Sequence, residues 1–139
     1  MDPLPQEKRE GELDPNTVSP RSLAFLGDAV YELKIRFYVL KNYNGKVGDV
    51  DALAKDLVSA RAQAAISDGL LDFFSEEEYK IFKRGRNVRS VSPPHSCSIS
   101  EYRRATGLEA LLGYLYIQGK EKRIDEIMQQ AEKIYEERK

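Results

Sequence analysis

Apolar residues recur every three or four positions along most of this chain, which is the spacing of amphipathic α-helices. The first such segment covers residues 20–43, and the stripe predicted to face the core comprises Leu23, Leu26, Val30, Leu33, Phe37 and Leu40. Ser19 and Pro20 suit the N-cap and the first turn of this helix. Asp28 interrupts the segment away from the stripe, so the pattern predicts a core helix with one isolated acid in its middle.

The next segments continue the helical spacing. Asp49 is predicted to cap a helix that ends near residues 68–69 and whose inward positions are Val50, Leu53, Leu57, Ala60 and Ala64. A short helical stretch over residues 70–74 follows. Ser75 and Glu78 then have the spacing of a capping box, which predicts a further helix ending in the basic residues 83–86.

The C-terminal part of the chain is predicted to hold two more helices after a loop at residues 87–99. Two adjacent prolines and several serines break any regular pattern in this loop. Ser98 and Glu101 form a second capping box, and Gly119 is predicted to close the helix that begins there. A final amphipathic helix presents Ile124, Ile127, Ala131 and Ile134. No segment alternates as a strand does, so the predicted fold class is all-α.

Two acids lie alone inside apolar helices. Asp28 is one, and Glu109 holds a similar position in the helix that follows Ser98. Glycine inside a helix is unfavourable by roughly 1 kcal/mol relative to alanine. Gly27, Gly107 and Gly113 therefore indicate places where another backbone or a ligand comes very close. We predict that packing brings Asp28 and Glu109 together as a carboxylate pair, compensated by a metal ion or by a basic partner.

Length and composition favour one cytoplasmic domain. With 139 residues, the chain can bury a single hydrophobic core. Residues 1–18 are acidic and rich in proline, so a flexible arm is expected there and the folded domain over residues 19–139. The sequence contains neither a long apolar run nor a signal-peptide pattern. Cys97 is the only cysteine, which excludes an internal disulfide, and together with His95 it is too little for a zinc site.

The distribution of charge matters more than its sum. The net charge is −1, but residues 80–104 contain seven Lys and Arg against Glu101 alone, a local net charge of +6 with the histidine neutral. Such a segment can hold nucleic-acid phosphates, although a solvated surface is the plainer alternative. The residues predicted to bind RNA are Lys83, Arg84, Arg86, Arg89, Arg103 and Arg104.

Two runs carry a family resemblance. The Leu–Gly–Asp–Ala–Val run at 26–30 and the Glu–Ala–Leu–Leu–Gly–Tyr–Leu–Tyr run at 109–116 resemble the two signature helices of the ribonuclease III catalytic domain. The runs at 57–60 and 84–87 fit, in the same order, the small bacterial branch called Mini-ribonuclease III, which lacks a double-stranded-RNA-binding domain. The resemblance covers roughly residues 19–138.

The resemblance implies a fold, an activity and partners. It implies the ribonuclease III endonuclease fold and hydrolysis of double-stranded RNA that leaves a 5′-phosphate and a 3′-hydroxyl. Asp28 and Glu109 match the family's acids, so they are the expected catalytic residues and the expected ligands of Mg²⁺, with Mn²⁺ as a substitute. It further implies a homodimer, a role in maturing large-subunit (23S) ribosomal RNA, and room for a ribosomal protein as helper.

The chain departs from the larger family members at two positions. These have further acids four residues before the first motif acid and three before the second, where this chain has Ala24 and Thr106. Two protein carboxylates would then surround the ion, and the number of ions per site stays open. The competing interpretation is a non-catalytic, dimeric helical module for RNA binding or ribosome assembly that has kept the fold.

Overall fold

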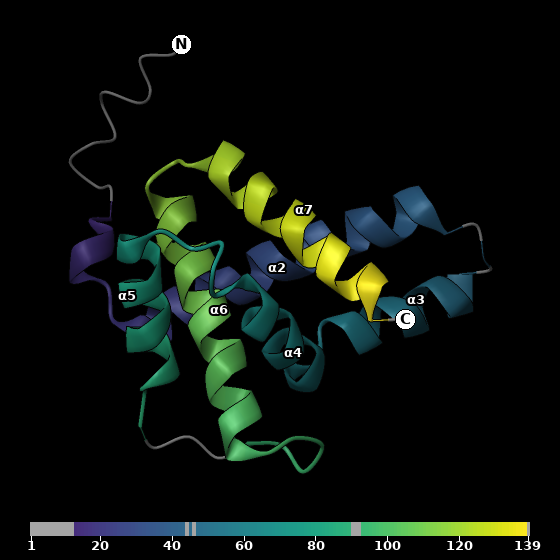
Figure 1. The fold of residues 1–139 in the computed structure, drawn as a ribbon, viewed down its shortest axis with the longest axis horizontal. Coiled ribbons are helices and arrows are strands. Elements are labelled where there is room, and N and C mark those ends of the chain that lie inside the picture. Colours follow the sequence, from purple (N-terminus) through teal and green to yellow (C-terminus); the bar gives the residue numbers. More distant parts are fainter. Residues whose placement is uncertain (1–12, 44, 46, 90–92, 139) are drawn as a thin grey trace.

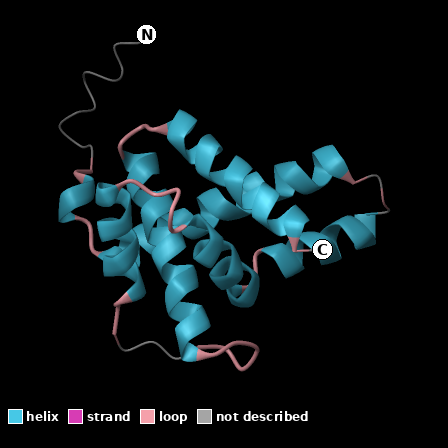
Figure 2. Ribbon diagram, in the orientation of Figure 1, coloured by secondary structure: helices cyan, strands magenta, loops and turns pink. Residues whose placement is uncertain are grey.

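The fold is known from a computed structural model that describes residues 13–43, 45, 47–89 and 93–138, and all regular structure in these residues is helical (Figures 1 and 2). The predicted all-α class is confirmed. A short 3-10 helix, η2, spans Pro15–Thr17. The α-helices that follow are α2 (Pro20–Asn42), α3 (Val47–Leu57), α4 (Ala60–Leu70), α5 (Glu76–Arg86), α6 (Ile99–Ile117) and α7 (Glu121–Glu137).

Local side-chain chemistry determines where most helices begin and end. The Ser19 hydroxyl accepts a hydrogen bond from the backbone of the first turn of α2. Complete capping boxes at Ser75 and Ser98 start α5 and α6, as predicted. Gly119, with φ of 76°, follows α6 in the left-handed region that glycine tolerates best. These ends were predictable because each depends on residues within four positions.

Helix α6 runs through the middle of the molecule and packs against most of the others (Figure 1). Its most extensive contact is with α2, and α5 and α4 cover other faces of it. Helix α7 lies across α4, and Arg123 ties it to the start of α5 through a two-pronged ion pair with Glu78, at 2.8 Å for each N–O contact. Completely buried side chains of the core include Tyr31, Val39, Leu70, Leu108, Leu111, Leu112, Ile124 and Ile127.

Helices α2 and α6 touch backbone to backbone. A Cβ atom added to Gly27 would lie 1.6 Å from the carbonyl oxygen of Glu109, and one added to Gly113 would lie 2.0 Å from the carbonyl oxygen of Leu23. No side chain fits in that space. The close approach predicted at these glycines is therefore confirmed, and the approaching group is the other helix.

Glycines also bring α5 against α6. A Cβ atom on Gly107 would lie 2.7 Å from the carbonyl oxygen of Phe82, and one on Gly85 would lie 2.6 Å from the Cβ of Ala110. The basic C-terminal end of α5 is consequently held close to the turn of α6 that carries Glu109.

The helix predicted without a break over residues 49–69 is wrong in this respect, because it is two helices. Helix α3 ends at Leu57, and Ser59 adopts an extended backbone and caps α4. The Ser59 hydroxyl donates to the carbonyl of Asp56 and accepts from the N–H of Ala62, so it competes with helical hydrogen bonding. Asp49 lies within the first turn of α3 rather than at its cap. The short helical stretch predicted over residues 70–74 is also wrong, because α4 ends at Leu70 and residues 71–74 form a turn and a bend.

The predicted core stripe of the first helix is only partly correct. Leu23 and Val30 are buried, but Leu33, Phe37 and Leu40 expose about two-thirds of their surface, at 66%, 66% and 68%. A second apolar face points inward instead, and its buried members are Tyr31, Ile35, Tyr38 and Val39. Both faces of α2 have helical spacing, so the periodicity could not decide which one packs.

Part of the expected N-terminal arm is folded. Residues 13–18 contain η2, Val18 packs against the core, and the Tyr114 hydroxyl donates to the side chain of Asn16 at 2.9 Å. Residues 1–12, for which the flexible arm was predicted as well, lie outside the described residues.

The α2–α6 contact generates a prediction about stability. Gly27→Ala should lower the free energy of unfolding by about 3 kcal/mol or more, because the methyl group must push two backbones apart. The matched control is Gly48→Ala in α3, where a Cβ would meet nothing within 4 Å. This control should stabilise by up to about 1 kcal/mol through helix propensity. Urea unfolding of the two variants and the parent measures both; equal stabilities of the two variants would contradict the close contact.

Candidate active site

The structure brings Asp28 and Glu109 together at the crossing of α2 and α6. Asp28 directly follows Gly27, whose Cα faces the carbonyl of Glu109. The Asp28 carboxyl lies close enough to Glu109 to raise the pKa of that carboxyl, through its charge and a side-chain hydrogen bond. Asp28 is exposed, whereas Glu109 is partly buried. The pair predicted from the sequence therefore exists and opens to solvent on the Asp28 side.

Burial and two neighbouring side chains change the pKa of Glu109. Desolvation raises the pKa of this carboxyl, a hydrogen bond from Gln63 lowers it, and the nearby Asp28 raises it again; together they bring it to about 8. Between its ordinary pKa and that value, Glu109 keeps a proton that it would lose in water. The carboxyl pair therefore carries less negative charge at neutral pH than its composition suggests.

Gln63, in the first turn of α4, is a site residue that sequence reasoning missed. Its side-chain amide donates to Glu109 Oε2 at 3.1 Å and to the carbonyl oxygen of Val58 at 3.0 Å, and only 2% of the residue is exposed. The available signal was a glutamine on the face that also presents Ile66, Ser67 and Leu70, all buried. A polar residue at such a position has to find a polar partner.

Tyr31 completes the buried surroundings of the pair. Its hydroxyl donates to the carbonyl of Leu57 at 2.9 Å, and the ring is fully buried. Desolvation, followed by the charge of Glu109, raises the pKa of this phenol. Tyr31 is thus neutral and satisfies a carbonyl that the end of α3 leaves free.

The two positions that differ from larger family members lie beside the pair but supply no carboxylate. Ala24 is buried, one turn before Asp28. Thr106 is half-buried, and its hydroxyl donates to the carbonyl of Tyr102 at 2.9 Å. Over the described part of the chain, no group of three or more His, Cys, Asp or Glu could surround a metal ion. Two carboxylates and solvent are what this site offers.

Three of the predicted RNA-binding residues meet in one groove. Arg86, Arg103 and Arg104 line a cavity of about 530 Å³ between the end of α5 and the start of α6, together with Asn87, Ile99 and Ser100. Arg104 is already engaged there, since its guanidinium contacts Asp68 Oδ1 at 3.1 Å and the Ser100 hydroxyl at 2.6 Å. Arg86 lies over the ring of Phe82, 5.9 Å from its centre.

The other three basic residues do not line this groove. Lys83 and Arg84 are exposed on α5, and the exposed Arg89 follows that helix. The Lys83 ammonium lies 5.7 Å from the ring centre of Tyr79. The basic segment therefore presents an open helix face and a groove. Its role in RNA binding stays a prediction.

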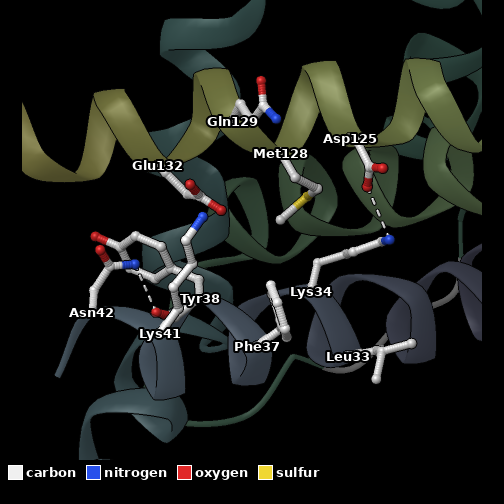
Figure 3. A pocket seen from close by; sticks show the side chains of 10 residues that line it. All are labelled: Leu33, Lys34, Phe37, Tyr38, Lys41, Asn42, Asp125, Met128, Gln129 and Glu132. Carbon is white, nitrogen blue, oxygen red and sulfur yellow. Dashed lines mark hydrogen bonds and ion pairs between the residues drawn. The ribbon is translucent and has the colours of Figure 1, made fainter. Parts of the chain in front are cut away.

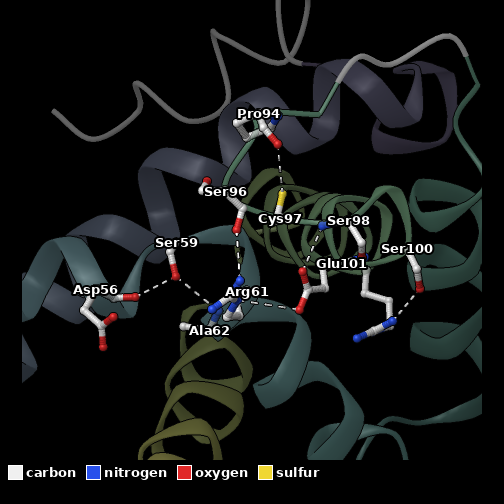
Figure 4. Close-up of polar contacts among 11 residues, drawn as sticks. Asp56, Ser59, Arg61, Ala62, Pro94, Ser96, Cys97, Ser98, Ser100 and Glu101 are labelled. Carbon is white, nitrogen blue, oxygen red and sulfur yellow. Dashed lines mark hydrogen bonds and ion pairs between the residues drawn. The ribbon is translucent and has the colours of Figure 1, made fainter.

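The loop before α6 is attached to α4 by Arg61 (Figure 4). The Arg61 guanidinium donates to the carbonyl of Ser96 at 3.3 Å and lies 3.9 Å from Glu101 Oε2. Glu101 in turn caps α6. The first turn of α4 thus contacts the loop through Arg61 and the acid pair through Gln63.

Comparison with known proteins decides the family. Residues 21–120 match the family model of the Ribonuclease III domain. The chain belongs to the ribonuclease III family. Similar curated proteins include the Mini-ribonuclease 3 of Brevibacillus brevis, 45% identical over 94% of this chain and 97% of that protein. The Mini-ribonuclease 3 of Staphylococcus aureus is 32% identical over 87% of this chain and 92% of that protein.

A solved structure supports the same assignment. The crystal structure of a protein from Fusobacterium nucleatum is 36% identical, covers 84% of this chain and 93% of its own, and superposes with a TM-score of 0.75. The resemblance seen in the sequence and the ribonuclease III fold are confirmed. Family membership supports an endoribonuclease, that is, a hydrolase that acts on RNA. In the described residues, no helix is both long and apolar enough to cross a membrane.

The raised pKa of Glu109 generates a prediction for the metal-free protein. The folded state retains this proton up to about pH 8, whereas the unfolded chain loses it near 4.5. The stabilisation is complete below the lower value and is lost as the pH rises through the higher one. The melting temperature in chelator should therefore fall between pH 5 and pH 9, and Glu109→Gln should flatten that fall.

The control for this measurement is Glu137→Gln, at the exposed end of α7. Its melting temperature should change with pH in the same way as that of the parent. If the melting temperature of Glu109→Gln also changed with pH as that of the parent does, Glu109 would ionise normally in the folded protein. Its assignment to a desolvated pair would then be wrong.

Proposed function

We propose that this protein is a metal-dependent endoribonuclease that cleaves double-stranded RNA and matures the ends of 23S ribosomal RNA. The observation that carries the proposal is the contact between Asp28 and Glu109 at the crossing of the two signature helices. The family match supports the class of enzyme, and the names of the similar proteins support the branch. The basic groove next to α6 supports a polyanionic substrate.

The acid pair fits a hard divalent cation. Two neighbouring carboxyl groups, one of them partly buried, repel each other when both are ionised. Desolvation is the main cause of the raised pKa of Glu109, and the charge of Asp28 adds to it. Mg²⁺ prefers oxygen ligands and often takes only one or two from the protein. Asp28 and Glu109 would hold Mg²⁺, or Mn²⁺ as its substitute. When bound, the ion would polarise a phosphate oxygen and lower the pKa of a nearby water.

The proposed reaction is hydrolysis of a phosphodiester. The oxygen of a water molecule forms a bond to phosphorus, and the bond from phosphorus to the 3′ oxygen breaks. The products are a 5′-phosphate and a 3′-hydroxyl, and the water supplies the proton of the latter. In this scheme the residues of the chain position the groups that react: Asp28 from the exposed side of the pair and Glu109 from the buried side.

The basic residues would hold the backbone of the RNA duplex. Arginine forks and lysine charges bind phosphates without reading the bases, so these contacts orient the substrate rather than select a sequence. Arg86, Arg103 and Arg104 supply the groove, and Lys83, Arg84 and Arg89 extend the positive surface from it. Duplex RNA is recognised mainly by such backbone contacts and by its shape.

A second copy of the chain would cover the exposed apolar face of α2. Phe25, Leu33, Phe37 and Leu40 expose between 66% and 85% of their surface along one side of this helix. Leu33 and Phe37 project beside the cavity between α2 and α7 (Figure 3). A two-fold dimer pairs a surface with itself, and an apolar helix face suits that requirement. We propose a homodimer on this face, with one active site in each subunit.

The proposed cellular setting rests on the resemblance to the Mini-ribonuclease III branch. A cytoplasmic protein that acts on precursor ribosomal RNA would meet its substrate during ribosome assembly, and a ribosomal protein could present that substrate. The name of the relatives, Mini-ribonuclease 3, supports a ribonuclease, and the ribosomal substrate and the cytoplasmic setting belong to the proposal. Cleavage of a precursor containing the ends of 23S ribosomal RNA, with and without ribosomal proteins, tests it.

Ala24 and Thr106 favour a second candidate, a non-catalytic dimeric module that binds RNA or assists ribosome assembly. Both positions lack the acids of larger family members. The retained contact of Asp28 with Glu109 argues for catalysis. Incubation of the pure protein with duplex RNA, in Mg²⁺ or in chelator, separates the two candidates.

The proposed chemistry predicts the effect of neutralising the pair. Asp28→Asn and Glu109→Gln should each lower the rate of duplex cleavage roughly a hundredfold or more, because each removes an anionic oxygen and preserves shape. Sedimentation should show that both variants keep the oligomeric state of the parent, since neither residue lies on the exposed apolar face of α2. Near-normal turnover of either variant at saturating Mg²⁺ would refute its role.

The proposed RNA contact predicts a change in salt dependence. Arg84→Ala with Arg86→Ala should weaken binding about equally for all duplex sequences. Each lost phosphate contact should reduce the slope of log K against log salt by about 0.9 or somewhat less. Lys133→Ala, an exposed cation on α7, is the control. Binding curves of the double variant that superimpose on those of the parent at every salt concentration would mean a merely solvated surface.

A further inference from the structure

Gln63 is a polar side chain at a position where an apolar one would pack more simply. Only 2% of the residue is exposed, and its buried neighbours on the same helix are small or apolar. Its Oε1 atom is buried and has no hydrogen-bond partner in the described structure. A buried acceptor without a partner destabilises a protein. Packing alone therefore does not explain a glutamine at this position.

The reason lies in its amide nitrogen. Nε2 has two hydrogens, and both have an acceptor: Glu109 Oε2 at 3.1 Å and the carbonyl of Val58 at 3.0 Å. These two acceptors fix the orientation of the amide, because a flipped amide would place Oε1 against two other oxygens. Gln63 in α4 therefore fixes the side chain of Glu109, which belongs to α6.

We propose that Gln63 is a positioning residue that holds the Glu109 carboxylate in the orientation needed to bind the divalent cation. The inference rests on the proposed function for its metal, and it adds a residue that touches neither the ion nor the RNA. Hydrogen bonds to ligating carboxylates commonly change metal affinity ten- to a hundredfold when they are removed.

Gln63 also has a structural role, which the experiment has to separate from the positioning role. Its second hydrogen bond satisfies Val58 at the break between α3 and α4. Removing the side chain could therefore loosen this break without any direct effect on Glu109. Ser67 offers the matched control, since it is completely buried one turn later in α4 and donates to the carbonyl of Gln63 at 2.8 Å.

The experiment compares Gln63→Met, which keeps length and loses both hydrogen bonds, with Ser67→Ala and the parent. Melting temperatures measured over a Mg²⁺ titration report binding of the ion without any need for cleavage. We expect Gln63→Met to raise the midpoint of this titration about tenfold. Duplex cleavage at fixed, sub-saturating Mg²⁺ should show a lower kcat and an unchanged KM. Ser67→Ala should lower the melting temperature and leave the Mg²⁺ midpoint at that of the parent.

Two further variants make the outcome decisive. In a Glu109→Gln background, Gln63→Met should add no further change in the Mg²⁺ midpoint, because its effect passes through the carboxylate. Gln63→Ser leaves room for water at Val58 and replaces the methionine variant if that fails to fold. A Mg²⁺ midpoint equal to that of the parent in the folded variant would overturn the positioning role. A parent that is stabilised by Mg²⁺ yet does not cleave RNA would refute the proposed function alone.

Discussion

The contact between the backbones of α2 and α6 is the constraint on which the rest of the structure depends. Gly27 and Gly113 let the helices approach so closely that no side chain could separate them. Asp28 and Glu109 are the neighbours of that contact, so their carboxyl groups have to meet. The repulsion and desolvation that follow are unfavourable taken alone. The large apolar interface between the same helices offsets them.

The break between α3 and α4 supports this pair. It leaves the carbonyls of Leu57 and Val58 without helical partners, and two side chains near the acids satisfy them. Tyr31 reaches Leu57 from α2, and Gln63 reaches Val58 from α4 while also holding Glu109. A continuous helix would have offered neither carbonyl. The break between α3 and α4 thus provides the acceptors that position Tyr31 and Gln63 near Glu109.

Charge and apolar surface are both distributed unevenly over the molecule. A net charge of −1 conceals a positive groove formed where α5 and α6 are held together through glycines. Helix α2 buries one apolar face in the core and leaves another exposed. The same helix therefore contributes the core, an acid of the candidate site and the surface proposed to pair with a second copy. Substitutions in it will often affect more than one of these.

Short-range patterns in the sequence determined the starts of α2, α5 and α6, the all-α class, and the family with its two acids. The caps at Ser19, Ser75 and Ser98 depend on neighbours a few residues away, so they could be recognised without a fold. Other features needed the tertiary structure because they depend on competition between distant groups. The periodicity of α2 permits either face to pack, and the close approach to α6 at Gly27 and Gly113 favours the face that is buried. The apolar spacing continues through Val58 and Ser59 as in one helix, but capping by Ser59 divides the segment into α3 and α4. The partners of Gln63 and Arg104 come from other helices, so no spacing along the chain predicts them.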